Sequence, residues 1–167
     1  MCQFKSGIVL PGKIIVPLDK DSHNEILNDL GIKDNTEFPN FVRIECVPLD
    51  GDIFNHNIDN WSVKVDQDFL PEWFDKAKTE KLMKEIYMPE VFEKSFIIGR
   101  EIEEINSGRW FVKNGIVQKL SGNAIIEQMR ESSTVNEMRG SSTARKFVFN
   151  KKSQIFVPKG SFEIVEI

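Results

Sequence analysis

The chain has 167 residues, of which 40% are hydrophobic and 29% are charged, and its formal net charge is −4. This composition is that of one globular domain, or of one domain with a short appended module. It excludes a membrane-spanning protein, because no run approaches the roughly 18 consecutive apolar residues of a span. The start, MCQFKSGIVLPGK, also lacks the cleavage site of a signal peptide, so we expect a soluble cytoplasmic protein without membrane contacts.

Charge is distributed unevenly along the chain. Residues 1–100 hold 12 Lys/Arg against 18 Asp/Glu, whereas residues 101–167 hold 10 against 8. The second part is thus far from the dense basic patch of a nucleic-acid binder. Duplex nucleic acid is not an expected partner, and we interpret both surfaces as solvated.

The opening of the chain predicts a hairpin followed by a short helix. Residues 3–9 and 13–17 flank a Leu-Pro-Gly turn signal, which is typical of a β-hairpin. The next stretch, DSHNEILNDLG, predicts a helix over residues 22–30. Ser22 is expected to cap this helix, and Gly31 to end it in a left-handed conformation.

Two strands are predicted next. FVRIECVPL, residues 41–49, alternates apolar and polar side chains, which indicates a half-buried strand, and NWSVKVDQD, residues 60–68, repeats the pattern. We expect the two strands to pair. Their connection, DGDIFNHNID, has the composition of a calcium loop but not its ligand spacing, so we interpret it as solvated.

A longer helix is predicted from Pro71 to about Tyr87, because proline suits the first helical position. Pro89 is expected to stop or restart this helix. Its expected apolar side comprises Trp73, Phe74, Ala77, Leu82 and Ile86.

From residue 96 onward the pattern changes to strands and turns, with a hairpin signal at Asn114-Gly115. Aligned at a period of nine from Asn114, the chain reads NGIVQKLSG, NAIIEQMRE, SSTVNEMRG and SSTARKFVF. The second position of each copy is small, the fourth is aliphatic and the seventh is large and apolar. The third and fourth copies begin at Ser132 and Ser141.

A period of nine argues against a helix, because nine residues make two and a half turns and would point successive copies in opposite directions. Short strands fit better: the second and fourth positions share one face, a turn follows, and the seventh position points back inward. No copy can bury its apolar residues alone, which favours stacking in a solenoid.

Two copies per coil would place residues 18 apart above one another. Lys119 would then meet Glu137, and Glu127 would meet Arg145, although a meander would also bring opposite charges together. The closing stretch, SQIFVPKGSFEIVEI, is expected to cap the stack. We therefore predict an α+β domain over residues 1–105, with an antiparallel sheet and two main helices, and a β-solenoid-like module over residues 106–167.

Candidate catalytic residues are Cys2 and His23. Removal of Met1 would place a thiol and an α-amine on one residue, as in N-terminal-nucleophile hydrolases, and a dyad of Cys2 with His23 is the alternative. The more ordinary interpretation is that Cys2 packs at the start of a strand. Cys46 lies within an apolar strand pattern, and we expect no disulfide.

Three candidate ligand-binding residues, Arg43, Trp61 and Trp73, could form a pocket together with Trp110, in which aromatic rings lie beside a cation, although large aromatics more often belong to the core. Arg130 and Arg139 are candidates for binding a signalling nucleotide. No metal or cofactor is expected, because the chain has only two histidines, 33 residues apart, and no phosphate-binding motif.

Several short stretches carry a resemblance to a known family. They are the opening MCQFKS, D-S-H at residues 21–23, F-V-R-I-E at 41–45, K-V-D at 64–66 and P-E-W-F-D at 71–75, followed by a drifting G-S-S-T tail. In this combination the chain resembles a family of uncharacterised small proteins carried by bacteriophages and mobile elements of Firmicutes and Bacteroidetes. Compared with such proteins, the fourth copy of the repeat has lost its Met-Arg ending.

The resemblance implies an accessory protein that acts by binding or assembly on a host protein, for example one of a defence system, or that sequesters a signalling nucleotide. The expected partner is therefore a host protein, or a second copy of the chain contacting the repeat module. A small hydrolase or transferase that uses Cys2 is the alternative function.

Overall fold

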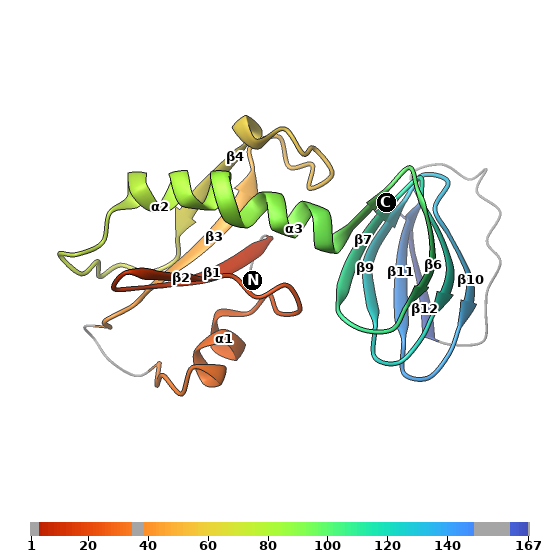
Figure 1. Ribbon diagram of the computed structural model, residues 1–167, viewed down its shortest axis with the longest axis horizontal. Coiled ribbons are helices and arrows are strands. Elements are labelled where there is room, and N and C mark those ends of the chain that lie inside the picture. Colours follow the sequence, from red (N-terminus) through yellow and green to blue (C-terminus); the bar gives the residue numbers. More distant parts are fainter. Residues whose placement is uncertain (1–3, 35–38, 149–160, 167) are drawn as a thin grey trace. The chain divides into compact units, whose positions relative to one another are not determined.

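The computed structural model of the chain describes residues 4–34, 39–148 and 161–166. The chain divides into two compact units, residues 1–92, termed the first unit, and residues 93–167, termed the repeat unit (Figure 1). Within the described ranges, each helix is too short or too polar to cross a lipid bilayer.

The first unit is built on an antiparallel sheet of order β2-β1-β3-β4. Its elements in chain order are β1 (Lys5–Leu10), β2 (Lys13–Ile15), α1 (His23–Asp29), β3 (Val42–Pro48), a 3₁₀ turn (Ile58–Asn60), β4 (Trp61–Val65), α2 (Lys76–Leu82) and a π-helical turn (Met83–Tyr87), with α3 (Met88–Ser95) following.

The predicted hairpin and the predicted strand pair are both confirmed. Strands β1 and β2 pair with Leu10 opposite Lys13, and Gly12 in their turn has a positive φ of 74°. Strands β3 and β4 pair with Glu45 opposite Lys64. Glycine tolerates a left-handed backbone, and Gly12 thus lies in the turn where the sequence predicted it.

The predicted half-buried character of residues 41–49 is wrong, because both faces of the sheet are covered. Helix α1 lies on one side of the sheet and α2 on the other (Figure 1). Glu45, predicted to face solvent, is buried beside the apolar residues of the same strand. The alternation of the sequence therefore separates an α1 face from an α2 face, and not a core from a surface.

Helix α1 begins after Ser22 and ends before Gly31, whose φ is 66°. This agrees with the predicted bounds to within one residue. The Ser22 side chain, however, makes no capping hydrogen bond.

The second helix differs from its prediction at its start. It begins after the N-cap Asp75, whose carboxylate accepts from the Lys78 N–H at 2.9 Å, and not at Pro71. At its other end the helical run reaches Tyr87 through the π-helical turn, and α3 begins at Met88 with Pro89 in its first turn, as the restart alternative predicted. A wide turn there removes the carbonyl clash that a proline ring meets in a regular helix.

The same wide turn changes which side chains are buried. Met83 and Met88, five residues apart, are both fully buried, whereas Ile86 of the expected apolar side is exposed. The expected apolar side is also wrong before this turn, since Ala77 is exposed and Thr79 is buried.

The repeat unit contains eight described strands in two parallel sheets, one of order β12-β11-β9-β7-β5 and one of order β10-β8-β6. The strands are β5 (Phe96–Ile98), β6 (Glu101–Ile105), β7 (Arg109–Lys113), β8 (Ile116–Leu120), β9 (Ile125–Arg130), β10 (Thr134–Met138), β11 (Thr143–Val148) and β12 (Ser161–Glu166). Strands β5 and β6, which the sequence assigned to the first domain, pair with strands of this unit.

Successive strands from β5 to β11 alternate between the two sheets. Thr134 lies beside Ile116 and Thr143 beside Ile125, a separation of 18 residues in each case. The predicted hairpin at Asn114-Gly115 is wrong, because the strands on either side of it, β7 and β8, lie in different sheets. The turn itself is present, with Asn114 in a left-handed conformation at φ 50°.

The three apolar positions of the repeat form the core of this unit. Buried members of the cluster from the second, fourth and seventh positions are Val117, Leu120, Ala124, Ile126, Met129, Val135, Met138 and Ala144. The turn is not between the fourth and seventh positions, as predicted, since one strand holds both. In β9 a register shift against β7 adds one residue between Ile126 and Met129, which returns Met129 to the inner face.

The turns follow the seventh position and centre on the ninth. Gly122, Glu131 and Gly140 hold this position with φ of 60°, 57° and 68°. Of the two predicted charge contacts, Lys119 does lie beside Glu137 in the sheet. The ion pair of Lys119 is nevertheless made with Glu104, at 2.7 Å.

Glu127, which was predicted to meet Arg145, makes an ion pair with Arg109 on β7. The closing stretch of the sequence falls largely outside the described residues. Its described part, β12, pairs in parallel with β11 at one end of the five-stranded sheet.

Candidate functional site

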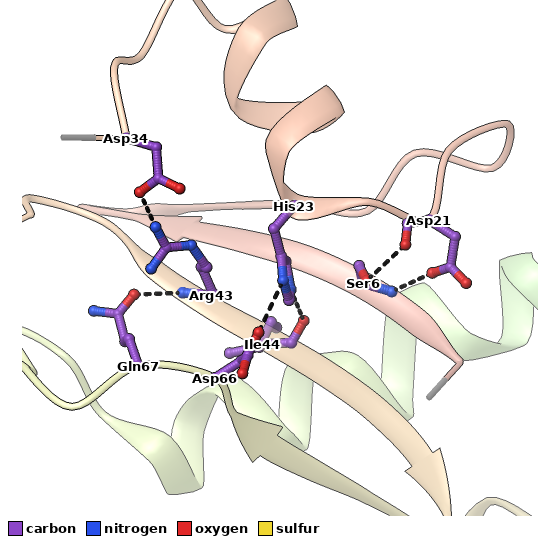
Figure 2. Close-up of polar contacts among 8 residues, drawn as sticks. All are labelled: Ser6, Asp21, His23, Asp34, Arg43, Ile44, Asp66 and Gln67. Carbon is purple, nitrogen blue, oxygen red and sulfur yellow. Dashed lines mark hydrogen bonds and ion pairs between the residues drawn. The ribbon is translucent and has the colours of Figure 1, made fainter. Parts of the chain in front are cut away.

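The strongest concentration of buried polar groups lies in the first unit, around His23 at the start of α1. The chain before the helix is held to β1 by Ser6, whose backbone N–H donates to the Asp21 carboxylate at 2.8 Å (Figure 2). The Ser6 hydroxyl donates to the Asp21 carbonyl at 3.2 Å. These bonds fix the point at which the helix begins, and with it the position of the imidazole.

The His23 ring points from α1 to the sheet and is only 5% exposed. Its Nε2 lies 2.9 Å from the carbonyl oxygen of Ile44 on β3. Its Nδ1 lies 3.3 Å from a carboxylate oxygen of Asp66 (Figure 2). Because a carbonyl oxygen can only accept, Nε2 carries a proton and donates it.

Asp66 follows β4 and is held by the neighbouring strand. Its backbone N–H donates to the Arg43 carbonyl at 3.0 Å. The next residue, Gln67, accepts from the Arg43 N–H at 2.9 Å and donates to the Phe41 carbonyl at 3.0 Å. The side chain of Asp66 is 61% exposed, so one side of the site is open to solvent.

Glu45 of β3 completes the cluster. It is 7% exposed, and one oxygen of its carboxylate, one of Asp66 and a ring nitrogen of His23 all lie within 4.8 Å of one another. One imidazole and two carboxylates are groups that bind metal ions in proteins. Among the described residues, these three are the group able to hold a cation.

The arrangement does not suit nucleophilic catalysis by Ser6. In a Ser-His-Asp triad the imidazole nitrogen remote from the carboxylate accepts the hydroxyl proton. Here that nitrogen, Nε2 of His23, donates to the Ile44 carbonyl, and the Ser6 hydroxyl donates elsewhere. The Cys2 partner predicted for His23 lies outside the described residues, so the predicted dyad stays a prediction.

The candidate ligand residues Arg43, Trp61 and Trp73 do not share one pocket. Trp61 is fully buried in the core, and its indole N–H donates to the Asn55 carbonyl at 2.7 Å. The Arg43 guanidinium pairs with Asp34 and lies over the ring of Phe41, 5.2 Å from its centroid.

Trp73 lines a cavity of about 260 Å³ between the β1–β2 hairpin and α2. The cavity is also lined by Lys13, Lys78 and Tyr87. A molecule bound there can therefore contact a lysine ammonium group or the tyrosine hydroxyl. The Trp73 indole N–H donates to Asn40 at 2.8 Å.

The other candidate ligand residues, Arg130 and Arg139, belong to the repeat unit. Arg130 ends β9. Arg139 follows β10, and its guanidinium pairs with Glu137 of the same segment. The five predicted ligand residues are thus divided between the two units.

Cys46 and Asp50 are among the groups with shifted pKa values in the first unit. Burial raises the pKa of the Cys46 thiol to about 12, which makes it an inert core group. Hydrogen bonds from the Asn55 side chain and the Asp52 backbone lower the pKa of Asp50. The oxygen-rich connection predicted to be solvated is therefore organised by its own side chains, as a series of short turns.

The sequence analysis missed Asp66 and Glu45 as site residues. Both lie in the short stretches that carry the family resemblance, as do Ser6, Asp21 and His23, and the fold brings these stretches together. The available signal was a carboxylate in the middle of one alternating strand, Glu45, and another directly after the next strand, Asp66. The two carboxylates form a site with His23 only because α1 covers that face of the sheet.

Comparison of the chain with protein-family models, with curated proteins and with solved structures finds no match. The resemblance to phage and mobile-element proteins therefore stays a prediction.

Proposed function

We propose that the repeat unit is a short β-solenoid and that the protein acts as a binding or assembly protein through it. Alternation of strands between two parallel sheets supports this, as does the separation of 18 residues between neighbours, which is two copies of the nine-residue repeat. A meander would instead pair consecutive strands antiparallel.

The surface proposed for binding is the outer side of β6, β8 and β10, termed the three-stranded face. Exposed or half-exposed polar and apolar side chains of these strands include Glu101, Glu103, Glu104, Ile116, Gln118, Lys119, Thr134, Asn136 and Glu137. Gln118 on the middle strand donates to Glu101 on one neighbour and accepts from Asn136 on the other. Side chains held in this way lose little further freedom when a partner binds.

The observation that carries the proposal is Ile116. It lies on the middle strand between Glu101 and Thr134, and it is 37% exposed. Ile116 is the first residue of β8, so it lies at one end of the polar, ordered three-stranded face. An exposed apolar side chain beside ordered polar groups is a feature of protein interfaces, in which apolar contacts are bordered by polar ones.

Charge indicates the kind of partner. Strand β6 contributes three glutamates, at positions 101, 103 and 104, so the three-stranded face favours a basic surface. Strands β7, β9 and β11 of the other sheet carry an excess of basic residues, with Glu127 as their acidic residue. A second copy of the chain therefore offers a complementary surface, and self-association is the form of binding that we expect.

Light scattering as a function of concentration and salt tests this proposal. We expect the wild-type protein to form oligomers that weaken in high salt, because exposed charge contacts are screened. Ile116→Lys should shift the protein to monomers. Leu49→Lys is the matched control, since Leu49 is also an exposed apolar residue but lies in the first unit.

A chain that is monomeric at every concentration contradicts self-association. In that case a pull-down from bacterial lysate with the same two variants tests whether the protein binds a host protein. A partner captured by Leu49→Lys but not by Ile116→Lys would keep the three-stranded face as the binding surface. Monomers without any captured partner would remove the proposal.

A further inference from the structure

The geometry of the first unit points to a site for a divalent first-row transition metal ion, with Nδ1 of His23 and the carboxylates of Asp66 and Glu45 as ligands. This inference is independent of the binding role of the repeat unit. We take Zn²⁺ as the representative ion, because an imidazole with two carboxylates suits zinc and its neighbours.

The protonation of His23 is the first step of the argument. Since Nε2 donates its proton to the Ile44 carbonyl, the neutral ring has a lone pair on Nδ1. That lone pair faces a carboxylate oxygen of Asp66 at 3.3 Å. Two electron-rich atoms at this distance repel each other unless a cation lies between them, either a proton or a metal ion.

The distance is compatible with a metal ion. A charge-assisted hydrogen bond between nitrogen and oxygen is shorter, about 2.7–2.9 Å. Two ligands of a tetrahedral zinc, each about 2.1 Å from the ion, are about 3.4 Å apart. The observed 3.3 Å between Nδ1 and the Asp66 carboxylate is therefore close to the edge of a zinc coordination sphere.

The hydrogen bonds around the proposed ligands are also those of a metal site. A metal-binding histidine usually donates its other ring N–H to a backbone carbonyl or a carboxylate, which fixes the tautomer and the ring orientation. The Ile44 carbonyl has this role for His23. The backbone N–H of Asp66 donates to the Arg43 carbonyl, so the imidazole of His23 and the backbone of Asp66 are placed before any ion binds.

The burial of Glu45 and the exposure of Asp66 indicate where the third ligand lies and where an ion enters the site. Glu45 approaches from the buried side of the site, whereas Asp66 lies at its solvent edge. An ion can therefore enter beside Asp66, and water can occupy a remaining coordination position. A site with three protein ligands and one open position is of the kind that binds a substrate or activates water.

Metal binding to the full-length chain, treated with a chelator and then dialysed, tests the inference. We expect titration calorimetry to show one Zn²⁺ per chain at neutral pH, and Co²⁺ to produce visible absorption bands. Asp66→Asn should weaken Zn²⁺ binding by more than about 100-fold, because loss of even an outer partner of a zinc ligand costs 10–100-fold. Mg²⁺ should not compete at equal concentration.

Asp68→Asn is the matched control, since it removes the same charge from an exposed residue two positions away. Its Zn²⁺ affinity should equal that of the wild type. Cys2→Ser should also bind normally, which separates this site from a thiol site. Circular dichroism establishes that each variant is folded, and Asp66→Asn is expected to fold because Asp66 is largely exposed.

Three results would overturn the inference. They are the absence of Zn²⁺ binding in the wild type, equal affinities of wild type and Asp66→Asn, and loss of binding in Cys2→Ser alone. The first would leave the contact between His23 and Asp66 as a hydrogen bond from a protonated ring.

Discussion

The two units bury different kinds of polar groups. In the described part of the first unit, Lys5, His23 and Glu45 are charged or titratable and buried. In the described part of the repeat unit, the buried polar residues are serines, among them Ser133 and Ser142. Buried charges need specific partners, whereas a hydroxyl at a turn needs only a nearby carbonyl. Chemistry is thus expected in the first unit, and a regular surface in the repeat unit.

The largest effect that would test this contrast is expected at Gly122 in a turn of the repeat unit. A Cβ atom there would lie closer than 3.0 Å to the Asn106 carbonyl oxygen, because the turn at Gly122 contacts the backbone of Asn106. The backbone is also left-handed, at φ 60°. We expect Gly122→Ala to lower the free energy of unfolding by about 3 kcal/mol or more, measured by urea denaturation.

Gly51 provides the matched control for this substitution. Its φ of 75° is similar, but a Cβ atom would meet nothing within 4 Å. Gly51→Ala should therefore cost only the conformational part, about 1–2 kcal/mol. Equal losses in the two variants would show that the turns of the repeat unit are not packed on one another.

A smaller effect is expected at the buried serines. Ser133 donates its hydroxyl to the Arg130 carbonyl. Ala124 occupies the same position of the preceding copy and is also buried. Ser133→Ala should cost about 1 kcal/mol in urea denaturation, the value of one hydrogen bond.

Ser6→Ala makes the corresponding change in the first unit, where the hydroxyl holds the segment before α1 to β1. We expect a similar loss of stability but an additional weakening of Zn²⁺ binding, since His23 follows that segment. Unchanged Zn²⁺ affinity in Ser6→Ala would contradict the positioning role given to this contact.

The smallest effects concern two surface carboxyls, one in each unit. The pKa of Glu104 is lowered by hydrogen bonds from Lys119 and Ser121, and that of Asp50 by the Asn55 side chain and the Asp52 backbone. Because the folded pKa of each group is depressed, each stabilises the fold above its unfolded pKa and loses this contribution as the pH falls through its folded pKa.

The partners of the two carboxyls predict different salt dependence. Lys119 is charged, so NMR titration in high salt should return the Glu104 pKa toward its ordinary value. The partners of Asp50 are neutral, and its pKa should change less. A salt response that is the same for both groups would contradict the assigned causes.

Much of the local structure was predictable from the sequence. The hairpin around Gly12, the end of α1 at Gly31 and the burial of the repeat positions follow from backbone conformation and side-chain size, which act over a few residues. The long helix was less predictable, because the π-helical turn before Pro89 changes the period that the pattern assumes.

The candidate site shows the limit most clearly. His23 was predicted as a functional residue, but with Cys2 as its partner. The structure brings His23 to Glu45 and Asp66, and Cys2 lies outside the described residues. Their strand pattern predicted a face exposed to solvent, and no pattern in the neighbouring residues indicates that a helix covers it.

The sequence by itself determined the regularity of this protein, since a nine-residue spacing of small, aliphatic and large side chains can bury its apolar groups only by stacking extended segments. The tertiary structure alone decided which sheet each strand joins and which polar groups meet beneath α1. Those outcomes depend on contacts between residues far apart in the chain. The energies of such contacts cannot be read from any short segment of the sequence.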